Sequence, residues 1–94
     1  MTFQEARVKQ EVKEWVIDFF QRRKEIPGEN EQDKLNVDYF AAGLLDSLAV
    51  VDLILSIEEK FRITLGPENM QDRRFCRIGG LSEIISEMLA PQNR

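Results

Sequence analysis

Three stretches of this chain carry apolar residues at the spacing of an α-helix, with Pro27-Gly28 and other proline or glycine pairs between them. The spacing predicts longer helices over residues 3–24, 47–61 and 81–89, and a shorter one around 71–76. No segment alternates apolar and polar residues over the length of a strand. We therefore expect an all-α fold, with three longer helices and one short helix.

The first longer helix has Thr2 as its expected N-cap, and Pro91 closes the last one. The connection from Pro27 to Leu45 is unusually long for a compact domain. Its first half is polar and is expected to be mobile, whereas apolar side chains in its second half should hold it against the body. Gly43 is expected to supply a turn before the second longer helix. These features predict a bundle with irregular connections, forming one domain over residues 1–94.

The composition excludes several functions. The 94 residues have a formal net charge of −4, which argues against nucleic acid as the main partner. Histidine is absent, so the commonest general base and metal ligand are missing, and we expect no metal site. No apolar run reaches the length of a membrane span, and the first residues do not resemble a signal peptide. We expect a cytoplasmic monomer.

The single Cys76 allows no internal disulfide bond and suits a reducing compartment. Its neighbour Phe75 favours a small buried side chain in the core. Alternatively, the three arginines nearby would lower the pKa of an exposed thiol and make it reactive.

The segment Gly43-Leu44-Leu45-Asp46-Ser47-Leu48 stands at the start of the second longer helix. Asp46 and Ser47 are both good N-cap residues, and a helix start needs only one. If Asp46 caps the helix, the Ser47 hydroxyl is left at a terminus where amide groups and the helix dipole favour a phosphate. Ser47 could then bear a phosphodiester. Taken alone, the local pattern fits a plain capping pair as well.

The second longer helix has apolar side chains on more than one side. If one row faces the core, a second row remains outside, and an exposed apolar row rimmed by acids marks a contact surface. The alternative is a central helix that is buried nearly all round. The expected inner row is Val50 or Val51, Ile54, Ile57 and Phe61, and the expected outer row is Leu48, Val51 or Asp52, and Leu55.

Over residues 5–89 the chain resembles the acyl carrier proteins of the phosphopantetheine-binding family. The resemblance is sharpest at 40–48, where Asp46-Ser47-Leu48 matches the triplet that opens the second helix of the family. Downstream, Ile57-Glu58-Glu59-Lys60-Phe61 and Ile63-Thr64-Leu65 are similar to the acidic helix end and the short extended link that follow. The resemblance implies an acyl-carrier-like four-helix bundle with a long loop between helices one and two.

The resemblance implies that Ser47, flanked by Asp46 and Leu48, bears a 4′-phosphopantetheine arm. A phosphopantetheinyl transferase would attach the arm from coenzyme A. The protein would be a carrier and not an enzyme, moving acyl or related groups as thioesters between acyl-loading and acyl-using enzymes of fatty acid, polyketide or other biosynthesis. The partner surface would comprise the apolar Leu48, Val51 and Leu55 and the acidic Asp46, Asp52, Glu58 and Glu59.

The chain departs from the common bacterial fatty-acid carriers in three places. Ala49 and Val50 stand where an acid often follows the triplet, Arg62 stands where glycine is common, and the usually acidic segment before the last helix reads Arg73-Arg74-Phe75-Cys76-Arg77. The changes in charge would alter which enzymes dock well, and they indicate a specialised discrete carrier. The pair Tyr39-Phe40 is similar to discrete aminoacyl or D-alanyl carriers, without fixing the cargo.

Two other functions remain open from the sequence. One is an unmodified helical adaptor that binds a partner through the apolar and acidic face of the second longer helix. The other is a hydrolase or transferase with Ser47 as its nucleophile, which is disfavoured because no histidine is present to activate the serine.

Overall fold

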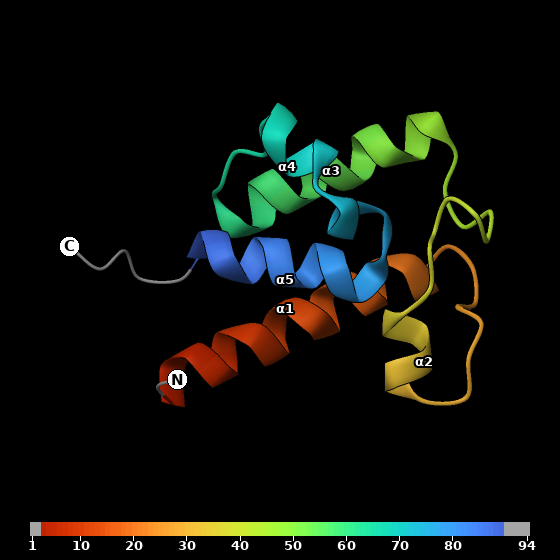
Figure 1. The fold of residues 1–94 in the computed structure, drawn as a ribbon, viewed down its shortest axis with the longest axis horizontal. Coiled ribbons are helices and arrows are strands. Elements are labelled where there is room, and N and C mark those ends of the chain that lie inside the picture. Colours follow the sequence, from red (N-terminus) through yellow and green to blue (C-terminus); the bar gives the residue numbers. More distant parts are fainter. Residues whose placement is uncertain (1–2, 90–94) are drawn as a thin grey trace.

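The computed structural model describes residues 3–89, and within them all regular elements are helical (Figure 1). The predicted all-α fold is confirmed. Asp38 and Arg77 form an isolated antiparallel bridge. Of the helices within residues 3–89, none has the length and hydropathy of a membrane-spanning segment. Thr2 and Pro91 lie outside the described residues. The elements are α1 (Phe3–Gln21), α2 (Glu31–Leu35), α3 (Ser47–Phe61), α4 (Pro67–Gln71), the 3-10 helix η1 (Arg73–Cys76) and α5 (Ile78–Leu89).

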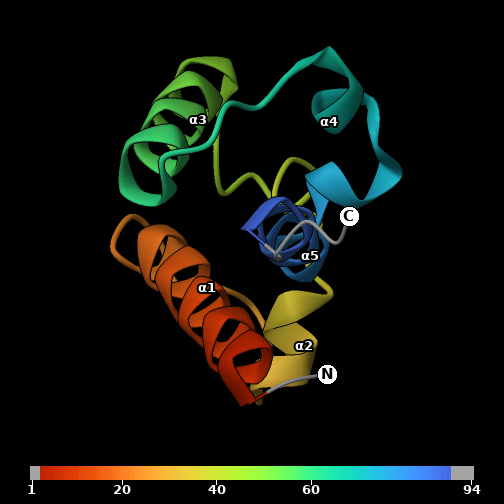
Figure 2. The same ribbon diagram turned by 90° about the vertical axis from the view of Figure 1, so that its left-hand side faces the viewer.

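Helix α5 is the central element of the bundle. Figure 2 shows it nearly end-on near the centre, with α1 and α3 to its left, α2 below it and α4 above it to the right. It packs against α1, α2 and η1, and most of its length is buried. Apolar side chains of α1, α3 and the connection before α3 complete one core with it. The most deeply buried members are Val12, Val16, Phe20, Ile26, Tyr39, Leu53, Ile57, Ile78, Leu81 and Ile85.

The first half of the long connection holds a helix, where the sequence had suggested a mobile polar segment. Asn30 caps α2, because its side-chain oxygen accepts a hydrogen bond of 2.9 Å from the backbone amide of Asp33. Glu31 and Asp33 near the start of α2 and Lys34 near its end suit the helix dipole. Leu35 is buried and lies against Gly79, where an added Cβ would be 2.9 Å from the Leu35 carbonyl oxygen. The apolar Leu35 therefore holds this polar segment against α5.

The segment before α5 also differs from the prediction. It forms α4 and η1 instead of one short helix around 71–76, and α5 begins at Ile78, three residues before the expected start. Gly79 and Gly80 therefore lie inside a helix. Gly80 permits a very close approach of η1, since a Cβ there would meet the Arg74 carbonyl oxygen and lie 2.7 Å from the Arg74 Cβ. Close packing, rather than helix termination, accounts for these glycines.

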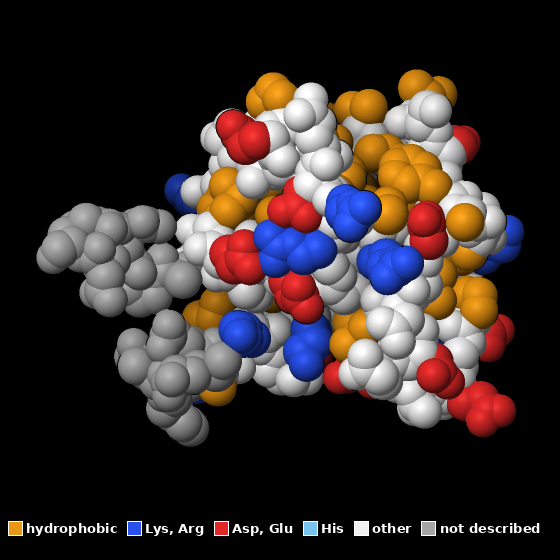
Figure 3. Space-filling view, viewed as in Figure 1, with side chains coloured by type: hydrophobic (Ala, Val, Ile, Leu, Met, Phe, Trp, Pro, Cys, Tyr) orange, Lys and Arg blue, Asp and Glu red, His pale blue; other side chains and the backbone are white. Residues whose placement is uncertain are grey.

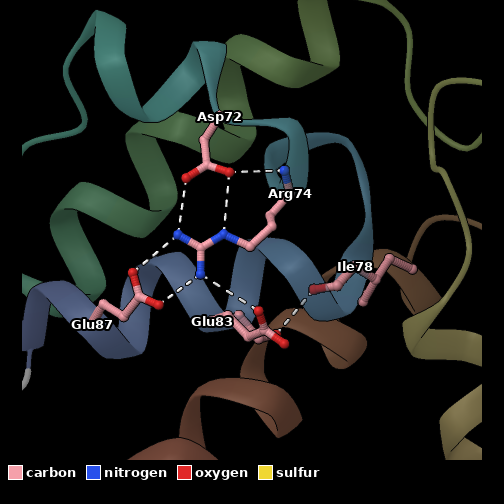
Figure 4. Close-up of polar contacts among 6 residues, drawn as sticks. Asp72, Arg74, Ile78, Glu83 and Glu87 are labelled. Carbon is pink, nitrogen blue, oxygen red and sulfur yellow. Dashed lines mark hydrogen bonds and ion pairs between the residues drawn. The ribbon is translucent and has the colours of Figure 1, made fainter.

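Arg74 holds η1 against α5 (Figure 4). Its guanidinium donates to Asp72 at 2.9 and 3.1 Å and to Glu87 at 2.6 and 3.0 Å, and it lies 3.5 Å from a carboxylate oxygen of Glu83. These contacts lower the pKa of Asp72 to about 2 and also lower the pKa of Glu87. Arg74 is therefore held by ion pairs within the chain, although the sequence grouped it with the arginines that would alter docking.

Arg62 caps the C-terminus of helix α3 and adopts the left-handed conformation with φ 57° and ψ 45°. A side chain with a Cβ is strained there and glycine is not. We expect Arg62→Gly to raise the free energy of unfolding by about 0.5–1 kcal/mol, because the relief of strain exceeds the entropy that glycine adds to the unfolded chain. Urea unfolding measures this change, and a lower midpoint in the variant would contradict the expectation.

Candidate attachment site at the start of helix α3

The connection that leads to α3 is fixed to the junction of η1 and α5. The Tyr39 amide donates to the Cys76 carbonyl at 3.1 Å, and the Ile78 amide donates to the Val37 carbonyl at the same distance. The Tyr39 ring is buried, and its hydroxyl donates to the Phe75 carbonyl. Burial raises the pKa of Tyr39 well above its usual range, so the phenol remains a donor. This junction therefore sets where the chain begins its approach to α3.

A tight turn follows. One carboxylate oxygen of Asp38 accepts hydrogen bonds of 3.0 Å from the amides of Phe40 and Ala41, and the Ala41 bond is the main cause of the lowered pKa of Asp38. Gly43 has φ 71°, which confirms the predicted turn. Leu44 is buried directly afterwards, as is Leu45. The chain thus leaves the core immediately before Asp46.

Helix α3 begins at Ser47, as the sequence predicted. Asp46 is the N-cap in an extended conformation, and its Oδ1 accepts a hydrogen bond of 2.8 Å from the Ala49 amide. Ser47 is exposed, and its hydroxyl makes no hydrogen bond with any residue that the structure describes. One of the two capping residues therefore caps the helix, and the other presents its hydroxyl to solvent.

This arrangement fits a phosphodiester on the Ser47 oxygen. The group would stand at the positive end of the 15-residue α3, where the first amides and the helix dipole favour a negative charge. Solvent exposure of Ser47 leaves room for an enzyme to reach the hydroxyl and for an arm to extend from it. Among residues 3–89, no side chain hydrogen-bonds to the Ser47 hydroxyl, so no described group is placed to activate it as a nucleophile.

The outer face of α3 carries the predicted apolar row. Leu48, Val51 and Leu55 have exposed fractions of 82%, 53% and 59%. The alternative of a helix buried nearly all round is therefore wrong, and Val51 belongs to the outer row and not the inner one. The inner side consists of the buried Leu53 and Ile57 with the half-buried Val50, Ile54 and Phe61. Leu53 was not among the expected inner residues, although it lies four residues before Ile57 on the same face.

The acids proposed for partner contact have different surroundings. Asp52 forms an ion pair with Arg23, whose guanidinium also lies 3.9 Å from the centre of the Phe19 ring. Glu58 accepts a hydrogen bond of 2.9 Å from the Leu65 amide and so holds the extended link after α3. Glu59 is exposed and makes no ion pair with a described residue. Glu59 is therefore the acid on this helix that is most available to a partner.

Cys76 is half-buried, and its sulfur lies 3.4 Å from the Arg73 carbonyl oxygen. Burial is the main cause of its raised pKa, with smaller contributions from Asp38. The nearby arginines do not reverse this direction. The thiol therefore stays protonated, which disfavours the reactive alternative, but Cys76 is not part of the buried core that the sequence suggested.

The structure is a small helical bundle with an exposed serine at the start of a helix, and this serine makes no hydrogen bond with a described residue. These features are typical of domains to which another group is attached. The sequence pattern of the family described as "Phosphopantetheine attachment site" matches residues 14–74. The chain belongs to this family. Its cofactor is thus a covalently attached 4′-phosphopantetheine, and carriers of this kind are not themselves enzymes.

Several curated relatives carry the name D-alanyl carrier protein. The chain is 42% identical over 52 residues to the one from Leuconostoc citreum, a match covering 55% of this chain and 63% of that protein. It is 50% identical over 38 residues to the one from Leuconostoc mesenteroides, covering 40% and 49% of the two chains. For the protein from Streptococcus equi subsp. zooepidemicus, the identity is 47% over 51 residues, covering 54% and 61%. The matches thus span about half to two thirds of these relatives, and no solved structure matches.

Proposed function

We propose that Ser47 bears the phosphopantetheine arm and that the chain is a discrete carrier of acyl or related groups. The observation that carries this proposal is that Asp46 and Ser47 have different roles at the start of α3. The Asp46 carboxylate caps the helix, and the Ser47 hydroxyl stays exposed. The arm, when attached, supplies a terminal thiol that holds cargo as a thioester. The chain's own residues hold the attachment oxygen at a fixed helix terminus and offer the adjacent outer face of α3 to partner enzymes.

The first test is attachment itself. The unmodified protein is incubated with coenzyme A, magnesium and a broad-specificity phosphopantetheinyl transferase, and its intact mass is measured. We expect the mass to rise by one phosphopantetheine. An unchanged mass, with a transferase shown to be active on another carrier, would contradict the proposal. It would also favour an unmodified adaptor.

For the cargo, we propose an amino acid, with D-alanine as the first candidate. The names of the three relatives support this choice, as does the Tyr39-Phe40 pair, whose rings lie 4.8 Å apart before the site. Protein isolated from cells that make it should carry one alanyl group that hydroxylamine releases, and chiral analysis should identify the D form. A fatty acyl or polyketide intermediate on the arm would contradict this assignment while leaving the carrier function intact.

The partners implied are a phosphopantetheinyl transferase and the enzymes that load and use the cargo. We expect Glu59→Lys to slow modification by the transferase several-fold at low salt, because complementary charge speeds and orients encounter. Glu25→Lys is the matched control, since Glu25 is exposed, lies between α1 and α2, and makes the same change of charge. Initial rates of both variants and the parent measure the effect, and equal slowing in the two variants would show that only net charge matters.

Glu58 requires a separate interpretation from Glu59. Because its carboxylate holds the Leu65 amide, Glu58→Lys would disturb the link after α3 as well as the charge of the surface. A slower reaction of that variant would therefore not identify a docking residue. The sequence pattern had treated the two acids as equivalent.

An unmodified adaptor is the second candidate, and the exposed Leu48, Val51 and Leu55 are the observation that favours it. A stable complex formed by the unmodified protein, unaffected by Ser47→Ala, would support the adaptor over the carrier. A cytoplasmic location and a monomeric state accord with the sequence and remain predictions, to be checked by cell fractionation and by light scattering of the purified protein.

A further inference from the structure

A second polar surface lies away from α3, and we call it the basic hollow. It is a cavity of about 820 Å³ between α1, α2, η1 and α5. Its basic side chains are Lys9 and Lys13 from α1, with Arg73, Arg74 and Arg77 from η1 and the residue that follows it. Figure 3 shows Lys and Arg side chains gathered near the middle of this face of the molecule.

The hollow exists because α5 turns small side chains toward it. Gly79, Ser82 and Ser86 line it, and the two serines are buried. The Ser82 hydroxyl donates to the Ile78 carbonyl at 3.1 Å, so its hydrogen-bonding capacity is satisfied within the helix. Gln32 and Asn36 from the region of α2 form another part of the rim. The lining is therefore mostly polar, and it does not suit a hydrocarbon chain.

The charge of the hollow is opposite to that of the whole chain. Five basic and two acidic side chains line it, a formal charge of +3, whereas the chain carries −4, so the rest of the chain carries −7. Arg74 is held by Glu83 and Glu87, the two acids of the lining. Arg73 and Arg77 are exposed, and neither forms an ion pair with a residue that the structure describes. The positive charge available to a ligand thus lies chiefly on Arg73, together with Lys9 and Arg77, which also interact with the carboxylates of Glu87 and Asp38.

We propose that the basic hollow docks an acidic segment of a partner enzyme. The cations come from α1 and from the η1 region, so they match several carboxylates spread along a chain better than one compact anion. The uncharged amides of Gln32 and Asn36 can bond to the backbone of such a segment. A partner that met both the acidic α3 face and the basic hollow would bind in one orientation only, because reversing it would bring like charges together.

The inference depends on the proposed carrier function only for calling the partner an enzyme, and the binding test is independent of Ser47. The probe is a fluorescein-labelled oligoglutamate peptide, whose anisotropy is followed at low salt. We expect the unmodified protein and Ser47→Ala to bind it equally. An oligoglutamine peptide of equal length should not bind.

We expect Arg73→Gln combined with Arg77→Gln to weaken peptide binding about tenfold. The matched control is Lys24→Gln combined with Lys60→Gln, which removes the same charge from exposed positions outside the hollow and should weaken binding less than about twofold. Urea unfolding should give the same midpoint for both double variants, so that a loss of binding does not reflect a loss of fold. Equal weakening by the two double variants would overturn the proposal.

Amide resonances locate the bound peptide. Shifts should concentrate around Lys9, Arg73, Arg77 and Gly79, and shifts confined to α3 would overturn the proposal. Displacement of the peptide by an equal concentration of inorganic phosphate would show a small-anion site instead, and binding to anionic lipid vesicles without binding to the peptide would show a membrane surface. Either result would also overturn it.

Discussion

Ser47→Ala should accept no phosphopantetheine, whereas the parent protein is converted completely. The side-chain oxygen is the atom through which the arm would be attached, and alanine removes it without disturbing the cap, because the cap is the Asp46 carboxylate. The fold should persist, since Ser47 is exposed and makes no hydrogen bond with a described residue. Intact mass after exhaustive incubation with a transferase measures the loss, and circular dichroism checks the fold.

Two variants of Asp46 separate attachment from capping. Asp46→Asn keeps a side-chain oxygen for the Ala49 amide and should leave the stability nearly unchanged, whereas Asp46→Ala should lower the free energy of unfolding by about 1 kcal/mol. Both variants retain the Ser47 hydroxyl, so both should still be modified to completion when folded. Modification of Ser47→Ala to the same extent as these variants would place the arm on another residue.

Gly80→Ala should lower the free energy of unfolding by about 3 kcal/mol, a loss that helix propensity alone would not predict. Alanine is favoured over glycine inside a helix by about 1 kcal/mol, so a Gly80 with free space around it would give a gain instead. The new Cβ would meet the Arg74 carbonyl oxygen and lie 2.7 Å from the Arg74 Cβ. Because backbone atoms cannot rotate away as a side chain can, η1 would have to move off α5.

Urea unfolding of Gly80→Ala shows whether the free energy of unfolding falls or rises, and this sign is the test. Gly66→Ala is the matched control, because a Cβ at Gly66 meets only the flexible carboxylate of Glu68, and its cost should be about 1 kcal/mol or less. A Gly80→Ala variant as stable as the parent, or more stable, would mean that η1 does not lie against α5 as described.

The sequence predicted those features that depend on residues close together in the chain. The start of α3 at Ser47 and the turn at Gly43 were predicted correctly, and Asp46 was one of two candidate caps, because capping and left-handed turns depend on residues close together in the chain. The exposed row of Leu48, Val51 and Leu55 was also found, since helical periodicity separates two faces. What such periodicity could not give was which neighbouring elements cover each face.

The features that the sequence did not predict depend on contacts between different elements. The sequence predicted the last helix only from Leu81, after Gly79-Gly80, since the approach of Leu35 and Arg74 to those glycines is not visible in the local sequence. Arg74 was grouped with Arg73 and Arg77 as a docking charge, although its partners Glu83 and Glu87 lie one and two turns into α5. The pairing of Asp52 with Arg23 spans 29 positions along the chain. In each case, the role of the residue depends on a contact with another element, which the local helical pattern does not show.

The most direct measurement is the position of the arm on the chain. The protein modified by a transferase is digested after lysine and arginine, and the peptide from Leu35 to Lys60 is fragmented in a mass spectrometer under conditions that keep the phosphodiester intact. The account predicts one phosphopantetheine, carried by Ser47 and not by Ser56, which lies on the same peptide. An arm on Ser56, or on any residue other than Ser47, would contradict it.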